Sequence, residues 1–159
     1  MLEARPLAGR PEIFARFGTQ FQALLTPRRI QTFVEHKLAE RAARHARAGG
    51  TVFVQEPNVK EGPGGLRDLQ MALWLAQVRH GAGTLDRAAA AGLLPPGQAA
   101  ACRTAHDLLL RLRHELHYQG GGRTDLLALS VQRAIAERLG YRDAPEAYGV
   151  ERFMQQYYL

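Results

Sequence analysis

The chain has 159 residues, of which 46% are hydrophobic and 23% are charged, so its composition is that of a globular protein rather than a disordered one. This length suffices for one hydrophobic core and is short for two, and we therefore expect a single domain over residues 1–159. The net charge of +6 would suit an anionic partner, but the cations are mostly scattered arginines without a nucleic-acid-binding motif, which argues against a nucleic-acid binder.

Two further features exclude other classes of protein. No apolar run approaches the ~20 residues of a membrane span, and no signal peptide opens the chain, so we expect a cytoplasmic protein with no membrane partner. The single cysteine, Cys102, allows no disulfide within the chain and is expected to be a small core residue.

Two helices are predicted before residue 50. The first runs from Pro11 to about Leu24, and Thr26-Pro27 is typical of the cap and first position of a second helix that ends near Arg47, before Gly49-Gly50. The first helix carries an apolar stripe at helical spacing, formed by Ile13, Phe14, Phe17, Phe21 and Leu24. The predicted buried face of the second consists of Ile30, Phe33, Val34 and Leu38. Its basic residues, Arg41, Arg44 and Arg47 with His45, are predicted to form a solvated face.

A short strand and a glycine-rich turn are predicted next. Residues 51–55 (TVFVQ) resemble a strand, and the segment EPNVKEGPGGLRDL follows from Glu56 to Leu69. Three glycines, Gly62, Gly64 and Gly65, surround Pro63 and predict a turn where a side chain would be in the way.

This turn has two interpretations. A strand, a glycine turn, a helix N-terminus and the basic flanks Lys60 and Arg67 are together typical of a phosphate site, although the spacing is neither that of a Walker A loop nor that of a GxGxxG fingerprint. The alternative is a structural turn that binds nothing. Asp68, in the first turn of the following helix, is explained by the helix dipole alone.

The rest of the chain predicts further helices. Residues 66–80 are apolar almost all round, which indicates a helix buried between neighbours. A short helix begins near Thr84, and a long one runs from about Gln98 to Tyr118, before Gly120-Gly121-Gly122. The core stripe of the long helix is predicted to be Ala105, Leu108, Leu109, Leu112 and Leu116. Two more helices are expected at residues 130–139 and 145–158. The predicted fold is mainly α, with about six to seven helices and one short strand before the glycine-rich turn.

No catalytic residue or metal site is predicted within the chain. His106-Asp107 spells the HD signature of metal phosphohydrolases, but the further ligands such a site needs are lacking. The HELH run has His114 and His117 one residue too close for a zincin, although both could hydrogen-bond to a ligand. His36, His45 and His80 are isolated and are expected at the surface or at helix caps.

The segment EPNVKEGPGGLRDL closely resembles the central region of the bacterial PII uridylyltransferase/uridylyl-removing enzymes. The resemblance covers essentially the whole chain, through LEARPLAG at residues 2–9, FVEHKLAERAARHAR at 33–47, LRHELH at 112–117, QRAIAERLGY at 132–141 and VERFMQQYY at 150–158. Asp125 matches the Asp of the family's Arg-Glu-Asp segment, but Thr124 replaces the Glu, which leaves any role of that loop open.

The resemblance implies a bifunctional enzyme. In the intact enzyme, magnesium-dependent transfer of UMP from UTP to the PII signalling protein occurs when glutamine is low, and hydrolytic removal occurs when it is high. The nucleotidyltransferase, HD and glutamine-sensing ACT domains of the family are absent from this chain, so the Mg²⁺ ligands are expected outside it and the isolated chain is expected to be inactive. The candidate nucleotide- or phosphate-binding residues are Lys60, Gly62, Gly64, Gly65 and Arg67, with Glu56 and Asn58 orienting the ligand.

Two alternatives remain open at this point. The related glutamine synthetase adenylyltransferases carry a similar GPGG-(I/L)-R segment, although EPNVKE and VERFMQQYY favour the uridylyltransferases. A helical adaptor that binds a protein and no nucleotide is the other alternative. In either case we expect the strand and the aromatic end, with Phe153, Tyr157 and Tyr158, to lack neighbours and to promote self-association.

Overall fold

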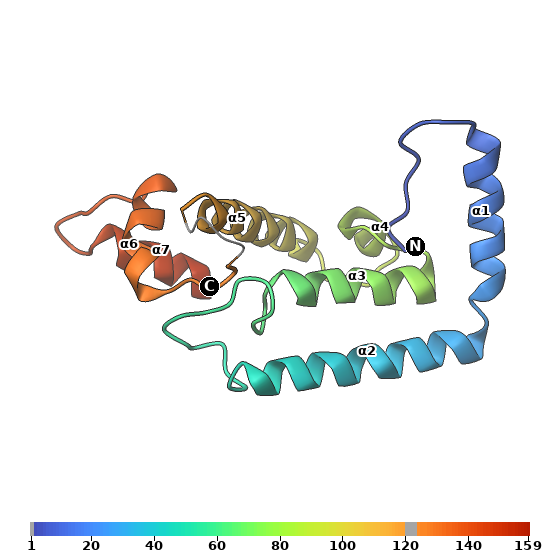
Figure 1. Ribbon diagram of the computed structural model, residues 1–159, viewed down its shortest axis with the longest axis horizontal. Coiled ribbons are helices and arrows are strands. Elements are labelled where there is room, and N and C mark those ends of the chain that lie inside the picture. Colours follow the sequence, from blue (N-terminus) through green and yellow to red (C-terminus); the bar gives the residue numbers. More distant parts are fainter. Residues whose placement is uncertain (1, 120–123) are drawn as a thin grey trace. The chain divides into compact units, whose positions relative to one another are not determined.

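The computed structural model describes residues 2–119 and 124–159, and these contain seven α-helices (Figure 1). They are α1 (Pro11–Leu24), α2 (Pro27–Arg47), α3 (Leu66–His80), α4 (Leu85–Ala90), α5 (Gln98–Gln119), α6 (Leu129–Arg138) and α7 (Gly149–Tyr158). The prediction of a mainly α fold is confirmed. The predicted triple-glycine end of the long helix, at residues 120–122, lies outside the described residues.

The chain forms two compact units. The first unit comprises Met1–Arg41 and Gln70–Ala100, and the second comprises Ala42–Leu69 and Ala101–Leu159. Helices α2, α3 and α5 each contribute residues to both units. The expectation of a single domain therefore stays a prediction.

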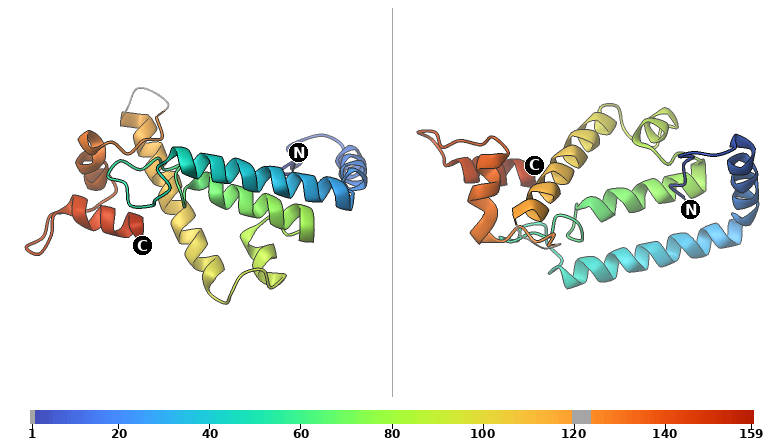
Figure 2. Two further views of the ribbon diagram at one scale, coloured as in Figure 1. Left: turned by 90° about the horizontal axis from the view of Figure 1, so that it is seen from below. Right: turned by 45° about the horizontal axis from the view of Figure 1, so that its top comes forward.

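The second unit is built around a small core at its centre. Helices α6 and α7 lie side by side in it (Figure 2), and the ring of Tyr141 meets that of Phe153 edge to face with centroids 5.4 Å apart. The buried core residues are Val59, Leu112, Leu116, Leu127, Ile135, Ala136 and Phe153. The predicted stripe of α5 is thus buried at Leu112 and Leu116, whereas Ala105 is exposed.

The first unit buries less of its predicted apolar surface. No residue of α1 is fully buried. Its stripe is exposed at Ile13 (60%) and Leu24 (52%) and half-buried at its three phenylalanines. On α2 the predicted face is buried at Val34, but Leu38 is exposed. The prediction that α3 is buried between neighbours is wrong in part, because only Met71 and Val78 are buried, while Ala72 is exposed.

The strand predicted at residues 51–55 is not formed. Its backbone donors are used locally, because the N–H of Phe53 bonds to Thr51 Oγ1 at 3.1 Å and the N–H of Val54 bonds to the carbonyl of Val52 at 3.1 Å. A strand needs a neighbouring strand for its ladder. The nearest equivalent in the described part of the chain is an isolated antiparallel bridge between Asn58 and Leu126.

The aromatic end of the chain packs against this extended segment. The Tyr158 hydroxyl donates a hydrogen bond to the Val54 carbonyl, and the ring centroids of Phe53 and Tyr158 lie 6.0 Å apart. Phe153 is fully buried. Burial, with a smaller contribution from Tyr158, raises the pKa of Tyr157 to about 12. The prediction that these aromatic residues lack neighbours is therefore wrong within the second unit.

Helix α7 begins at Gly149, four residues later than predicted. The bridge between Ala144 and Ala147 forms a tight loop before it. Asp143 accepts a hydrogen bond from the N–H of Gly149 at 2.7 Å, and Glu151 accepts one from the N–H of Tyr148 at 2.9 Å. These carboxylates satisfy donors at the helix start, which fixes the boundary there.

The predicted glycine turn is present and is tied to the core at both ends. The N–H of Val59 donates to the carbonyl of Asp125 at 2.9 Å, and the N–H of Leu127 donates to the carbonyl of Pro57 at 2.9 Å. After the turn, the N–H groups of Leu66 and Arg67 donate to the carbonyls of Val59 and Lys60 at 3.1 and 3.0 Å. The start of α3 therefore rests on the segment that carries the buried Val59.

Two glycines of the turn are required by its geometry. Gly64 has φ of +76°, in the left-handed region that a side chain disfavours. A Cβ atom at Gly65 would lie 2.9 Å from each of three carbonyl oxygens, those of Val59, Lys60 and Gly62. These are backbone atoms that cannot move aside without breaking the bonds that start α3.

We predict that Gly65→Ala destabilises the chain, because the added methyl group overlaps backbone oxygen atoms. Overpacking of this kind costs about 1–3 kcal/mol. Gly18→Ala in α1 is the control, because a Cβ there meets nothing within 4 Å and alanine favours a helix. Urea denaturation followed by the helical circular dichroism signal measures both variants. Equal stability of the Gly65→Ala variant and the parent chain would contradict the close approach described above.

Candidate anion-binding site

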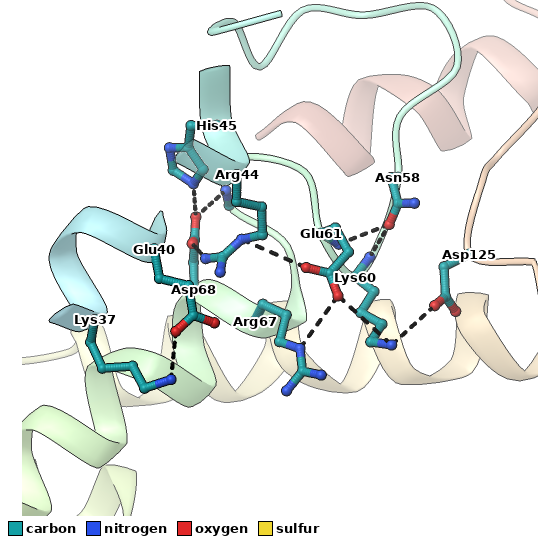
Figure 3. Close-up of polar contacts among 11 residues, drawn as sticks. Lys37, Glu40, Arg44, His45, Asn58, Lys60, Glu61, Arg67, Asp68 and Asp125 are labelled. Carbon is teal, nitrogen blue, oxygen red and sulfur yellow. Dashed lines mark hydrogen bonds and ion pairs between the residues drawn. The ribbon is translucent and has the colours of Figure 1, made fainter. Parts of the chain in front are cut away.

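Asp68 lies at the centre of a cluster behind the glycine turn (Figure 3). Its Oδ1 accepts a bond from Arg44 Nη2 at 2.5 Å, and its Oδ2 lies 2.8 Å from His45 Nε2. The same Oδ2 accepts a bond from the N–H of Gly64 at 2.9 Å. Helix α2 therefore supplies two cationic or polar side chains to a carboxylate that also holds the turn.

This cluster overturns three expectations. Arg44 is only 8% exposed and lies among the buried residues, not on a solvated face. His45 is half-buried and bonded rather than isolated. The helix dipole alone does not account for Asp68, because its burial would raise its pKa, while the bonds from Gly64, Arg44 and His45 outweigh burial and lower the pKa. A buried arginine needs such a partner.

A second carboxylate, Asp125, gathers basic side chains in the same way. Its Oδ1 accepts a bond from Arg113 Nε at 2.8 Å and lies 3.0 Å from His117 Nε2. Lys60 Nζ lies 3.7 Å from the other oxygen, Oδ2. Burial would raise the pKa of Asp125, but the bonds from Arg113 and His117 and the charges of Arg113 and Lys60 together lower it.

Glu61 joins the basic side chains at the front of the turn. Its Oε1 lies 3.4 Å from Arg67 Nε and 3.7 Å from Lys60 Nζ, and its Oε2 lies 3.8 Å from Arg44 Nε (Figure 3). Lys60 therefore stands between two carboxylates, those of Glu61 and Asp125, at distances longer than a direct hydrogen bond.

The structure brings the candidate site residues together, but it gives several of them roles within the turn. Asn58 Oδ1 accepts bonds from the N–H groups of Lys60 and Glu61 at 3.1 and 2.8 Å, which closes the start of the turn. Glu56 Oε1 accepts a bond from the N–H of Leu129 at 2.8 Å and so anchors the segment to α6.

The backbone donors of the turn already have partners. The N–H groups at positions 59–62 and 64–68 bond to oxygen atoms of the chain, and Pro63 has none. An anion in this arrangement would therefore meet side chains, chiefly Lys60 and Arg67, rather than the backbone of Gly62, Gly64 and Gly65.

Sequence reasoning missed the contribution of α5. Arg113 and His117 are four residues apart, which places them on one face of a helix, and this spacing was the available signal. It overlaps the HELH run, whose other histidine, His114, is exposed. The contact of both side chains with Asp125 depends on the fold of the second unit and leaves no pattern in the sequence.

The described residues do not fit a metal ion. Within 2–119 and 124–159, no group of three or more His, Cys, Asp or Glu side chains could hold one. His106 is half-buried next to an exposed Asp107, and Cys102 is half-buried rather than enclosed in the core. In the same residues, no helix is both long and apolar enough to cross a membrane.

Known proteins resemble this chain closely. The protein-family model described as GlnD PII-uridylyltransferase matches residues 32–159. Proteins named bifunctional uridylyltransferase/uridylyl-removing enzyme from Erythrobacter litoralis, Rhodospirillum rubrum and Azospirillum brasilense are 42%, 40% and 38% identical to it over 159 residues. These matches cover 100% of the chain and 17% of each relative, so the chain spans about a sixth of the length of the curated relatives it matches.

No solved structure matches the chain significantly. The family match nevertheless covers most of the chain, including the glycine turn, the Asp68 and Asp125 clusters, and α5 to α7. The full-length identity to the curated relatives extends the similarity to α1. The chain belongs to the GlnD PII-uridylyltransferase family.

Proposed function

We propose that the chain is the corresponding central part of a bifunctional enzyme that transfers UMP from UTP to the PII signalling protein and removes it by hydrolysis in response to glutamine, thereby controlling nitrogen assimilation. The observation that carries this proposal is the identity of 38–42% over all 159 residues to relatives that bear the uridylyltransferase/uridylyl-removing name. The same names favour this activity over that of the adenylyltransferases. By the family resemblance, we assign the glutamine-binding and hydrolytic parts to regions of the intact enzyme outside this chain.

Within that enzyme, the second unit assists nucleotide binding with the side chains of Lys60 and Arg67. Lys60 Nζ is 3.7 Å from its nearest carboxylate oxygens, so its donors remain available to a phosphate. Arg67 is 39% exposed at the start of α3. Gly62, Gly64 and Gly65 make the turn compact, and Glu56 and Asn58 hold it in place through the bonds described above. Two cations on a rigid turn can orient a triphosphate and neutralise part of its charge.

The Mg²⁺ that the family resemblance implies does not fit the described residues, because they contain no ligand set for it. We therefore assign Mg²⁺ and the reacting carboxylates to other parts of the intact enzyme. The contribution of this chain is to position and to stabilise charge, and no step of the transfer depends on a metal within it.

We predict that Lys60→Ala or Arg67→Ala, in the full-length enzyme, raises the KM for UTP in UMP transfer by about tenfold or more, because a charge-assisted contact of about 1.5–3 kcal/mol is lost. Removal of UMP from PII should change little. Arg111→Ala on α5 is the matched control, since Arg111 is exposed and is not among the residues of the Asp68, Asp125 and Glu61 clusters described above. Steady-state kinetics of both reactions, together with the melting temperature, make the test. Unchanged KM values for UTP with a lowered melting temperature would make the turn structural.

We also predict that the 159-residue chain alone neither transfers UMP nor removes it, because both reactions are expected to need a metal ion and its described residues contain no group of three or more His, Cys, Asp or Glu side chains that could hold one. Incubation of PII with radioactive UTP, Mg²⁺ and the purified chain measures transfer, and uridylylated PII measures removal. Labelling of PII that follows the chain through purification would contradict this assignment.

The last expectation concerns Asp68, which keeps the turn closed. Its pKa is lowered on folding, so its stabilisation is complete above its unfolded pKa of 3.8 and is lost as the pH falls below that value through the folded pKa. Asp68→Asn should destabilise the chain by about 3 kcal/mol at pH 7, because the buried Arg44 loses its closest counter-charge and keeps only Glu61, at 3.8 Å. Denaturation at pH 7 and pH 3 should show a smaller acid effect in this variant than in the parent or in the control Asp107→Asn. An equal acid effect in all three would contradict the role of Asp68.

A further inference from the structure

Arg113 and Lys60 meet at one carboxylate although they come from different elements of the second unit. Arg113 lies on α5 and Lys60 on the glycine turn, and Asp125 receives both. The three residues belong to the same compact unit, and the N–H of Val59, next to Lys60, bonds to the backbone carbonyl of Asp125. Asp125 therefore fixes the turn through its backbone and the two cations through its side chain.

Both cations keep hydrogen-bond donors that no residue in the described part of the chain accepts. Arg113 donates from Nε to Asp125 Oδ1 at 2.8 Å, and its two terminal nitrogens donate to none of the described residues. Lys60 approaches its carboxylates only to 3.7 Å. The side chains of Arg113 and Lys60 are 33% and 30% exposed, so a ligand from solvent can reach them while their stems are held.

The local charge favours an anion. Three positively charged side chains, those of Lys60, Arg67 and Arg113, surround two carboxylates, those of Glu61 and Asp125, so one positive charge is left over. His117 adds a further donor on the same Asp125 oxygen as Arg113. The bond from Arg113 Nε to Asp125 fixes the direction of the two terminal nitrogens of the guanidinium. The side chain is thus ordered before a ligand binds, which reduces the entropy lost on binding.

We propose that Arg113 and Lys60 form a binding site for a phosphate or diphosphate group, with Asp125 and His117 as positioning residues. A guanidinium edge offers two parallel N–H donors that match two phosphate oxygens, and the ammonium group adds a point charge beside it. The identification of the phosphate as part of UTP rests on the proposed function, whereas the site itself rests on these contacts. Arg113 extends the Lys60 and Arg67 pair to three cations around a polyphosphate.

The test is calorimetric titration of the 159-residue chain with inorganic pyrophosphate, UTP and uridine at constant ionic strength. Pyrophosphate and UTP should bind and uridine should not. Arg113→Gln should weaken pyrophosphate binding by about tenfold or more, and Arg113→Lys, which keeps the charge and loses the fork, should weaken it by less. Arg111→Gln, two residues away on the same helix and exposed, should bind as the parent does.

Several results would overturn the proposal. They are no pyrophosphate binding by the parent chain, unchanged binding by Arg113→Gln, or an equal loss in Arg111→Gln, which would indicate a general effect of net charge. Melting curves identify any variant that has lost its fold, and Arg113→Lys then provides the comparison. If Arg113→Gln loses pyrophosphate while Lys60→Ala and Arg67→Ala leave UMP transfer unchanged, the site stands and the proposed role in UTP use fails. If Arg113→Gln binds pyrophosphate normally while Lys60→Ala and Arg67→Ala impair UMP transfer, the role in UTP use stands and the Arg113 site fails.

Discussion

The approach of backbone to backbone at Gly65 is the constraint on which the second unit depends. Three carbonyl oxygens lie 2.9 Å from the position that a Cβ of residue 65 would occupy, and two of them, those of Val59 and Lys60, accept the N–H groups that begin α3. Val59 is fully buried, so the start of α3 is placed relative to the core by a few backbone bonds rather than by side chains. The charged side chains of the candidate site come from this turn, from α2, from the start of α3 and from α5, and Asp125 comes from the segment between α5 and α6.

Asp68 and Asp125 hold basic side chains in the same way. Asp68 and Asp125 each lie within bonding distance of one arginine and one histidine, and each has its pKa lowered because those bonds outweigh burial. Ion pairs with buried members contribute less to stability than their number suggests, because desolvation opposes the attraction. What they provide here is a fixed conformation. Asp68 fixes the turn through the N–H of Gly64, and Asp125 fixes the side chains of Lys60 and Arg113.

The parts of the fold that the sequence predicted are those with local signals. Pro11, the Thr26-Pro27 pair and the glycines after Arg47 mark helix ends within a few residues, and the bounds of α1 and α2 follow from them. The prediction of a strand at residues 51–55 was wrong because strand formation depends on a neighbouring strand, which local composition does not reveal. Arg44 was assigned to a solvated face because its partner, Asp68, is 24 residues away. For the same reason the glycine pattern predicted the turn but could not show that its N–H groups were already bonded.

The bond between Gly64 and Asp68 also has a consequence for backbone dynamics. Gly64 is exposed, and an exposed glycine amide normally exchanges its proton with water rapidly. Here that proton is held by a carboxylate whose charge is itself stabilised by Arg44 and His45, so exchange requires the turn to part from Asp68. The exchange rate at this one amide therefore reports how often the turn separates from the start of α3, where Asp68 lies.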